Sequence, residues 1–244
     1  MRFGKLGFNW SLLTRDNVAG LVWSLKEKLT KNELSPQQFH STLAAHIQKH
    51  IPVRTKKVID TKVDPGHVWV GGTYYSEYDR SREKCIEVWL VYKNKETSIN
   101  MTRQRYRKLC YTIADTILHE IIHMRQFRRR KFKDLPDYPS NASRSSQREE
   151  QSYIGNSDEI DAYSFNIACE LMDNFHNDIP QVIEYLNLDQ KGSRKIFNTW
   201  RMYLRAFDHD HDHPIIKRVK KKVIRYLPLA AIGKPYRNQD WISQ

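Results

Sequence analysis

Two histidines and a glutamate stand together in the stretch His119-Glu120-Ile121-Ile122-His123. Residues four apart on a helix lie on one face, one turn from each other, so both imidazoles can reach a single ion. Imidazole pairs at this spacing bind zinc, and the adjacent Glu120 can act as general base toward a water activated by that metal. The stretch therefore predicts a zinc-dependent hydrolase, and within that class a peptidase. The alternative is a coincidental match, to which composition alone gives roughly a few per cent.

The surrounding sequence, from Met101 to Lys131, contains no Pro or Gly and predicts one long helix with Thr102 as its N-terminal cap. Its apolar residues recur at the spacing of one helical face. They are Cys110, Ile113, Ala114, Ile117, Leu118, Ile121 and Ile122. At about 100° per residue, His119 and His123 fall opposite the middle of this stripe, and Glu120 lies on its flank. Such a helix suits the wall of a metal-binding cleft.

His46 and His50 offer a comparison within the same chain, since they are also four residues apart on a predicted helix. No glutamate stands between them, and their neighbours include Gln48 and Lys49. A histidine pair alone is a weak metal signal, so these two are expected to be ordinary surface residues.

A catalytic zinc usually takes three protein ligands and leaves a fourth position to water. Because no histidine lies between His123 and His176, the third ligand is expected to be a downstream carboxylate. Residues 156–175 predict a second helix, and Glu159 lies in its first turn, on the less apolar side. Glu159 is the preferred ligand and Asp158 the reserve.

Other roles stay open for these acids. Asn156 followed by Glu159 has the spacing of a capping box, in which the glutamate closes the start of a helix and binds no metal. Asp115 and Asp161 could orient an imidazole by a hydrogen bond, and each could equally be a solvated or capping acid.

The box His119-Glu120-x-x-His123, followed 36 residues later by Glu159, resembles the gluzincin branch of the zincin metallopeptidases, which includes thermolysin. The run that begins at Glu159 also resembles the glutamate helix of small, minimal gluzincins. The resemblance covers roughly residues 69–172. It implies His119, His123 and Glu159 as the zinc ligands and Glu120 as the base.

In the expected chemistry, zinc polarises the scissile carbonyl and activates water, while Glu120 takes the proton and delivers it to the leaving amine. Tyr163 stands where thermolysin-like enzymes have an aspartate, four residues after the ligand glutamate. Either Tyr163 or a histidine of the tract 208–213, with His213 and His211 preferred, could stabilise the oxyanion. The alternating Asp/His tract could instead bind a second metal ion, or form a solvated loop whose acids cap the next helix.

The element pattern predicts an α+β fold, mostly helical, with a small antiparallel sheet. Helices outside the two already described are expected over residues 15–30, 37–50, 181–186, 193–207 and 214–226. Strands are expected at 67–75 and 85–92, joined as an antiparallel hairpin. The resemblance implies a zincin-like domain in which residues 69–75 form an edge strand that holds an extended peptide substrate. The alternative is an ordinary structural hairpin with a glycine bulge.

At 244 residues, the chain is expected to form a single domain over 1–244. Within it we expect a zincin-like catalytic core at 53–187 and a C-terminal helical extension at 188–244. Residues 131–156, rich in Pro, Ser, Asn, Arg and Gln, predict a long loop. Without a signal-peptide core or an apolar run of about eighteen residues, the expected protein is cytoplasmic and has no membrane partner. The three widely spaced cysteines are typical of reduced, partly buried thiols.

The net charge of +13 points to partners beyond a peptide or protein substrate. Basic residues crowd the segments 125–133 and 217–225. An excess of this size predicts attraction to polyanions, such as nucleic acid or an acidic protein surface. A second class of function is therefore open, a basic nucleic-acid-associated or structural protein with a structural or inactive zinc site. Zinc-dependent hydrolysis of a non-peptide bond is a third.

Overall fold

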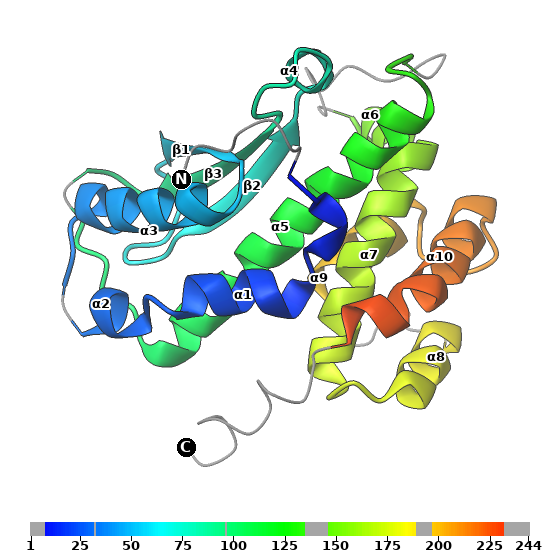
Figure 1. Ribbon diagram of the computed structural model, residues 1–244. Coiled ribbons are helices and arrows are strands. Elements are labelled where there is room, and N and C mark those ends of the chain that lie inside the picture. The colour runs from blue at the N-terminus through cyan, green and yellow to red at the C-terminus, as the bar shows by residue number, and fades with distance from the viewer. Residues whose placement is uncertain (1–7, 32, 96, 135–145, 189–196, 232–244) are drawn as a thin grey trace. The chain divides into compact units, whose positions relative to one another are not determined.

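The computed structural model describes residues 8–31, 33–95, 97–134, 146–188 and 197–231 (Figure 1). Helices make up most of the described chain and three strands form one small sheet, which confirms the expected mostly helical α+β fold. Packing divides the chain into two compact units, residues 1–125 and 126–244. The division falls inside one continuous helix, α5 (Arg103–Arg129), so the last turn of α5 belongs to the second unit.

The N-terminal unit begins with a 3-10 helix, η1 (Trp10–Leu12), and three helices, α1 (Arg15–Trp23), α2 (Lys26–Thr30) and α3 (Pro36–His50). Capping boxes at Thr14 and Ser35 start α1 and α3. The single helix expected over residues 15–30 is wrong, because the chain breaks between α1 and α2. At the break the Ser24 hydroxyl donates to the carbonyl of Leu21, a local bond that competes with helix continuation.

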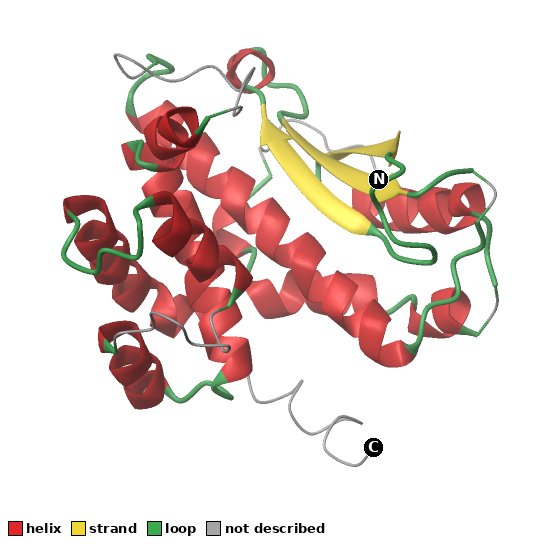
Figure 2. Cartoon of the chain, turned by 180° about the vertical axis from the view of Figure 1, so that it is seen from behind, coloured by secondary structure: helices red, strands yellow, loops and turns green. Residues whose placement is uncertain are grey.

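Three strands form the sheet of this unit: β1 (Arg54–Ile59), β2 (Trp69–Tyr74) and β3 (Ile86–Tyr92). Their order is β1-β3-β2. Figure 2 shows this sheet in yellow. The predicted hairpin is confirmed, because β2 and β3 are antiparallel, and a short helix, α4 (Ser76–Arg80), lies in their connection. The expected small antiparallel sheet is mixed instead, because the third strand, β1, pairs with β3 in parallel.

β1 was not predicted from the sequence, because Arg54, Lys56 and Lys57 interrupt the apolar pattern of a strand. Tertiary contacts hold it extended. Its backbone pairs with β3 along its whole length, and Gln48 of α3 donates to the hydroxyl of Thr55. The alternation of β3 is clear by contrast, since every second residue from its first position onward is buried.

The predicted long helix is present as α5. The hydroxyl of Thr102 accepts a hydrogen bond from the backbone N–H of Arg105 at 3.2 Å, as expected of an N-terminal cap. The predicted apolar stripe is buried along its length, except for Leu118, which is half-buried. All three cysteines are free thiols, as expected, but they are fully buried where the sequence predicts partial burial: Cys85, Cys110 and Cys169.

The described part of the C-terminal unit is helical, with α6 (Gln147–Ile154), α7 (Ser157–Asn174), α8 (Ile179–Asn187), α9 (Asn198–Ala206) and α10 (Pro214–Ala230). The other four helices all contact α7, and α10 lies along it (Figure 1). α9 and α10, which come from the segment expected to be an extension, therefore pack on the same helix as α6 and α8. None of the described helices is both long and apolar enough to cross a membrane.

α6 occupies part of the stretch expected to be a long loop. Its start carries a capping box, in which Ser146 accepts from the backbone N–H of Glu149 and the Glu149 carboxylate accepts from the backbone N–H of Ser146. This local signal is present in the sequence but is hidden by the polar composition around it. Residues 135–145 of the expected loop, and residues 193–196 of the helix expected before Phe207, lie outside the described residues.

Candidate metal centre

His119 and His123 lie one turn apart on α5, and their rings approach one another closely. The Nε2 atoms are 3.2 Å apart, and the ring centroids are 4.9 Å apart. Both side chains are almost fully buried, with exposed fractions of 9% and 7%. Adjacent turns of one helix therefore bring two ring nitrogens together.

The separation of these nitrogens fits a shared metal ion. Zinc binds histidine nitrogen at about 2.0–2.1 Å with tetrahedral angles, which places two such nitrogens about 3.3 Å apart. The 3.2 Å between Nε2 of His119 and Nε2 of His123 is close to that value. Imidazole nitrogen, with carboxylate oxygen, is also among the usual donors to zinc in catalytic sites.

Glu120 is buried beside a glycine of the sheet. It exposes 6% of its surface. A Cβ at Gly72 of β2 would lie 2.9 Å from both Cγ and Oε1 of Glu120, and 2.7 Å from Cγ2 of Thr116. Contacts this short require something to move, so the carboxylate keeps its position because residue 72 lacks a side chain.

Glu159 lies in the first turn of α7 and is 2% exposed. Asn156 caps this helix by accepting a hydrogen bond from the backbone N–H of Asp158 at 2.9 Å. The positive end of the helix dipole favours a carboxylate in this turn, which lowers the cost of burying Glu159 as an anion.

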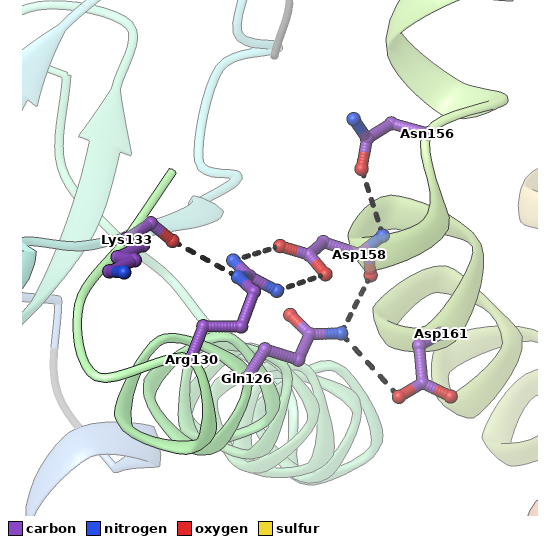
Figure 3. A network of polar contacts seen from close by, with 6 residues as sticks. All are labelled: Gln126, Arg130, Lys133, Asn156, Asp158 and Asp161. Atoms are coloured by element: carbon purple, nitrogen blue, oxygen red, sulfur yellow. Dashed lines mark hydrogen bonds and ion pairs between the residues drawn. The ribbon is translucent and has the colours of Figure 1, made fainter. Parts of the chain in front are cut away.

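A polar clamp joins the end of α5 to the start of α7 (Figure 3). Arg130 makes two parallel hydrogen bonds to the carboxylate of Asp158, at 2.8 and 2.6 Å. Gln126 donates to the backbone carbonyl of Asp158 at 3.1 Å and to Oδ2 of Asp161 at 3.4 Å. Both oxygens of Asp158, the reserve ligand, are therefore engaged by Arg130.

Gln126 and Arg130 of this clamp continue the helical face that carries His119 and His123. His119, His123, Gln126 and Arg130 follow one another at intervals of four, three and four residues, so they fall on one helical face within about 60°. His119, His123 and Glu159 are the one group of histidine, cysteine, aspartate or glutamate side chains among the described residues that could hold a metal ion. These are the same three residues that the sequence favours as zinc ligands, and that role stays a prediction.

The acids considered as partners of an imidazole make other contacts. Asp115 receives two hydrogen bonds from the buried Arg15, at 2.6 and 3.0 Å. Asp161 accepts from Gln126 and also from Lys222 of α10, the latter at 2.6 Å. Through these contacts, both acids tie helices together.

Tyr163 and Glu159 stand four residues apart on α7, and both are close to a buried tyrosine. The ring centroids of Tyr163 and Tyr203 are 6.1 Å apart, edge to face. The pKa of Tyr203 is raised well above its ordinary value, first by burial and then by the nearby Tyr163 and Glu159. Tyr203 therefore stays protonated, and its hydroxyl donates to the carbonyl of Ile154 at 2.9 Å.

His213 lies at the start of α10, where its Nδ1 accepts a hydrogen bond from the backbone N–H of Ile215 at 3.2 Å. Its ring centroid lies 4.5 Å from that of Phe207. In the same tract, the ring of His211 meets that of Trp200 edge on. The cap of α10 is thus a histidine of the tract, whereas the sequence pointed to its acids for that role.

His46 takes part in local helix packing. Its Nε2 is 3.0 Å from both the Ser24 hydroxyl and the Leu21 carbonyl. The ring of His50, which is exposed, has its centroid 5.0 Å away. His50 is therefore a surface residue as expected, while His46 is half-buried and has a structural role.

Three residues around the site were not identified from the sequence: Gly72, Gln126 and Arg130. Gly72 belongs to the expected strand 69–75 and to its possible glycine bulge, but a glycine inside a strand is also typical of close approach by another element. Gln126 and Arg130 continue the helical face of the two histidines, and that spacing could have identified them.

Buried polar and charged side chains are concentrated in two short motifs, His119 to His123 on α5 and Asp158-Glu159 on α7. Eight polar or charged side chains are buried among the described residues. Five of them belong to the two motifs: His119, Glu120, His123, Asp158 and Glu159. Buried ionisable groups are costly unless they are paired, as Asp158 is with Arg130, or bound to metal, so these residues make up the candidate functional site.

No protein-family model matches this chain. Neither a curated protein nor a solved structure shows a significant similarity to it.

Proposed function

We propose that this chain is a zinc-dependent metallopeptidase of the gluzincin type, in which His119, His123 and Glu159 bind zinc. The observation that carries the proposal is the 3.2 Å separation of two buried imidazole nitrogens on adjacent turns of one helix. A buried carboxylate from a second helix completes a donor set of the composition that catalytic zinc uses.

Zinc held by these residues would supply Lewis acidity and lower the pKa of a bound water towards neutrality. Glu120 is the general base of the proposal. Its buried carboxylate accepts the proton of the attacking water and delivers that proton to the leaving amine. Gly72 supports this role by leaving room for the carboxylate against β2.

Tyr163 is the preferred donor to the oxyanion. It stands one helical turn after Glu159 on α7, so the two side chains leave the same face of that helix. His213 is the second candidate. Its Nδ1 accepts the N–H of Ile215, which leaves the proton of the neutral ring on Nε2 as the hydrogen available for donation.

The substrate of the proposed enzyme is a peptide or an unfolded protein segment. The strand order β1-β3-β2 leaves β2 at an edge of the sheet. An edge strand can pair with an extended peptide through its backbone, which gives affinity with little sequence preference. The glycine that accommodates Glu120 lies on this same strand.

The test replaces Glu120 with Gln, which keeps the shape of the side chain and removes the base. We expect zinc to be retained and cleavage of an unfolded protein such as casein to fall by about 100-fold or more. Undiminished cleavage by the zinc-loaded E120Q protein would rule out the proposed mechanism. The matched control is Glu184→Gln, an exposed position on α8, which should leave cleavage unchanged.

A further inference from the structure

α10 has two faces of different chemistry. One face is apolar and buried, and the helix contacts α7. Its buried residues are Ile216, Val219, Val223, Leu227 and Ala230. The rest of the helix is rich in Lys and Arg and contains no acidic residue. α10 is therefore anchored on one side and cationic on the other.

Two of the cations of α10 are neutralised within the fold. Lys217 pairs with Asp212 at 2.9 Å, and Lys222 pairs with Asp161 at 2.6 Å. A third, Lys220, is half-buried, and burial lowers its pKa. These three contribute less to an external field than fully exposed, unpaired cations would.

The remaining cations are Arg218, Lys221 and Arg225, which we call the α10 cationic stripe. All three are exposed, and none makes an ion pair with another described residue. Their spacing of three and four residues places them on one face of the helix, over a length of about 10 Å. The stripe is a row of uncompensated positive charge on a rigid element.

We propose that the α10 cationic stripe binds the phosphate backbone of nucleic acid. A 10 Å length of DNA duplex carries about six phosphates, about three on each strand. Three cations spread over the same length can therefore each contact a phosphate. Two of the three cations are arginines, whose guanidinium groups suit phosphate oxygens. The net charge of +13 attracts the same polyanion from a distance. Contacts to phosphate carry no sequence preference.

A membrane surface fits this face less well. A helix that lies on a bilayer inserts an apolar face between the lipids, but the apolar face of α10 is buried within its own unit. Only two apolar side chains of α10 are among the large exposed ones, Ile224 at 40% and Leu229 at 68%. The exposed chemistry of the helix is therefore that of a phosphate-contacting surface.

The test measures binding of a fluorescent DNA duplex of about 20 base pairs by anisotropy, between about 50 and 200 mM salt. The variant R218Q/K221Q/R225Q removes the stripe. The control K62Q/K84Q/K95Q removes the same charge from exposed lysines of the N-terminal unit. We expect the stripe variant to bind DNA at least about tenfold more weakly than the wild type at the lower salt. We also expect the slope of log binding constant against log salt concentration to become less negative by about 2.7, the value for three phosphate contacts.

The control should bind within about twofold of the wild type. Equal losses in the two triple variants would show that net charge alone is responsible, and would overturn the proposal, as would an unchanged stripe variant. If the wild type binds vesicles of anionic phospholipid but not DNA, and the stripe variant loses vesicle binding, the face is assigned to membranes instead. The variant His123→Ala should bind DNA normally, so a failure of the zinc proposal and a failure of this one can be told apart.

Discussion

Arg130 binds the carboxylate of Asp158 through two parallel hydrogen bonds, at 2.8 and 2.6 Å, and thereby fixes the first turn of α7 to the end of α5. The side chain of Asp158 is 5% exposed, so this is a largely desolvated ion pair. Its neighbour in the sequence is Glu159. The pair therefore holds the proposed third zinc ligand in place without touching the metal.

Replacement of Arg130 by Gln tests this positioning role. The change leaves the buried Asp158 without its cation, which should lower the free energy of unfolding by about 3 kcal/mol. Zinc affinity should fall about 10- to 100-fold, as it does when groups that orient ligands are removed. The measurement is competition with a chromophoric zinc chelator. The control is Arg129→Gln, an exposed neighbour on the same turn. Unchanged zinc affinity in a folded R130Q protein would contradict the positioning role.

Glu159 and Asp158 should respond differently to removal of charge. Glu159→Gln removes a proposed ligand, so zinc binding should weaken by at least about 100-fold while the clamp stays intact. Asp158→Asn keeps the ligand set and weakens the clamp, so its main effect should be on the thermal midpoint of unfolding. Both are read out by zinc titration and thermal denaturation. The assignment of Glu159 fails if D158N loses zinc while E159Q keeps it.

Gly72→Ala should impair catalysis by moving Glu120. The new methyl group would lie within 3.0 Å of both Glu120 and Thr116, so β2 or the carboxylate must shift. We expect turnover to fall by at least about tenfold with zinc retained, because a misplaced base is a poor one. Gly71→Ala is the comparison. Its Cβ would meet Trp89 at 3.2 Å and not the base, so its effect should fall on stability. Equal turnover in the two variants would argue against the role of Gly72.

Acidification should destabilise the protein through His40. Burial lowers the pKa of His40 below 6.5, and the nearby Lys57 lowers it further. The unfolded chain then takes up a proton at higher pH than the folded protein. The corresponding stability is therefore present above pH 6.5 and is lost as the pH falls through the folded-state pKa.

The measurement is the urea midpoint between about pH 7.5 and about pH 5.5, the range in which histidine titrates. His40→Gln should reduce the loss of stability on acidification. Lys57→Gln should reduce it less, because burial is the larger cause. If H40Q loses as much stability as the wild type over this range, His40 is not the group responsible.

The fold could be predicted where the pattern is long and local. α5 follows from an apolar stripe over many turns and from the cap at Thr102, and the β2–β3 hairpin follows from the strand patterns on either side of a polar connection. β1 was missed because half of its residues are basic and its strand conformation depends on pairing with β3. α6 was missed because its one clear local signal, the capping box at Ser146, lies in a polar segment.

The residues of the candidate site also differ in whether local sequence spacing is enough to predict them. His119 and His123 could be predicted as a pair because their spacing along one helix brings the side chains together, and Glu120 because it stands inside the same motif. Glu159 could be predicted only because a catalytic zinc needs a third ligand downstream of the histidines, and because its helix resembles the glutamate helix of small gluzincins. Gly72 and Arg130 act through partners distant in sequence, and those contacts exist only in the folded chain.

The zinc content of the purified protein decides the assignment of the metal site. The wild type, His123→Ala and the control His50→Ala are each loaded with zinc, dialysed against a weak chelator and analysed for metal, with circular dichroism to confirm folding. We predict about one equivalent of zinc in the wild type and in H50A, and loss of that zinc in folded H123A. A wild type that retains no zinc, or an H123A protein that retains as much as the wild type, would contradict the proposed site.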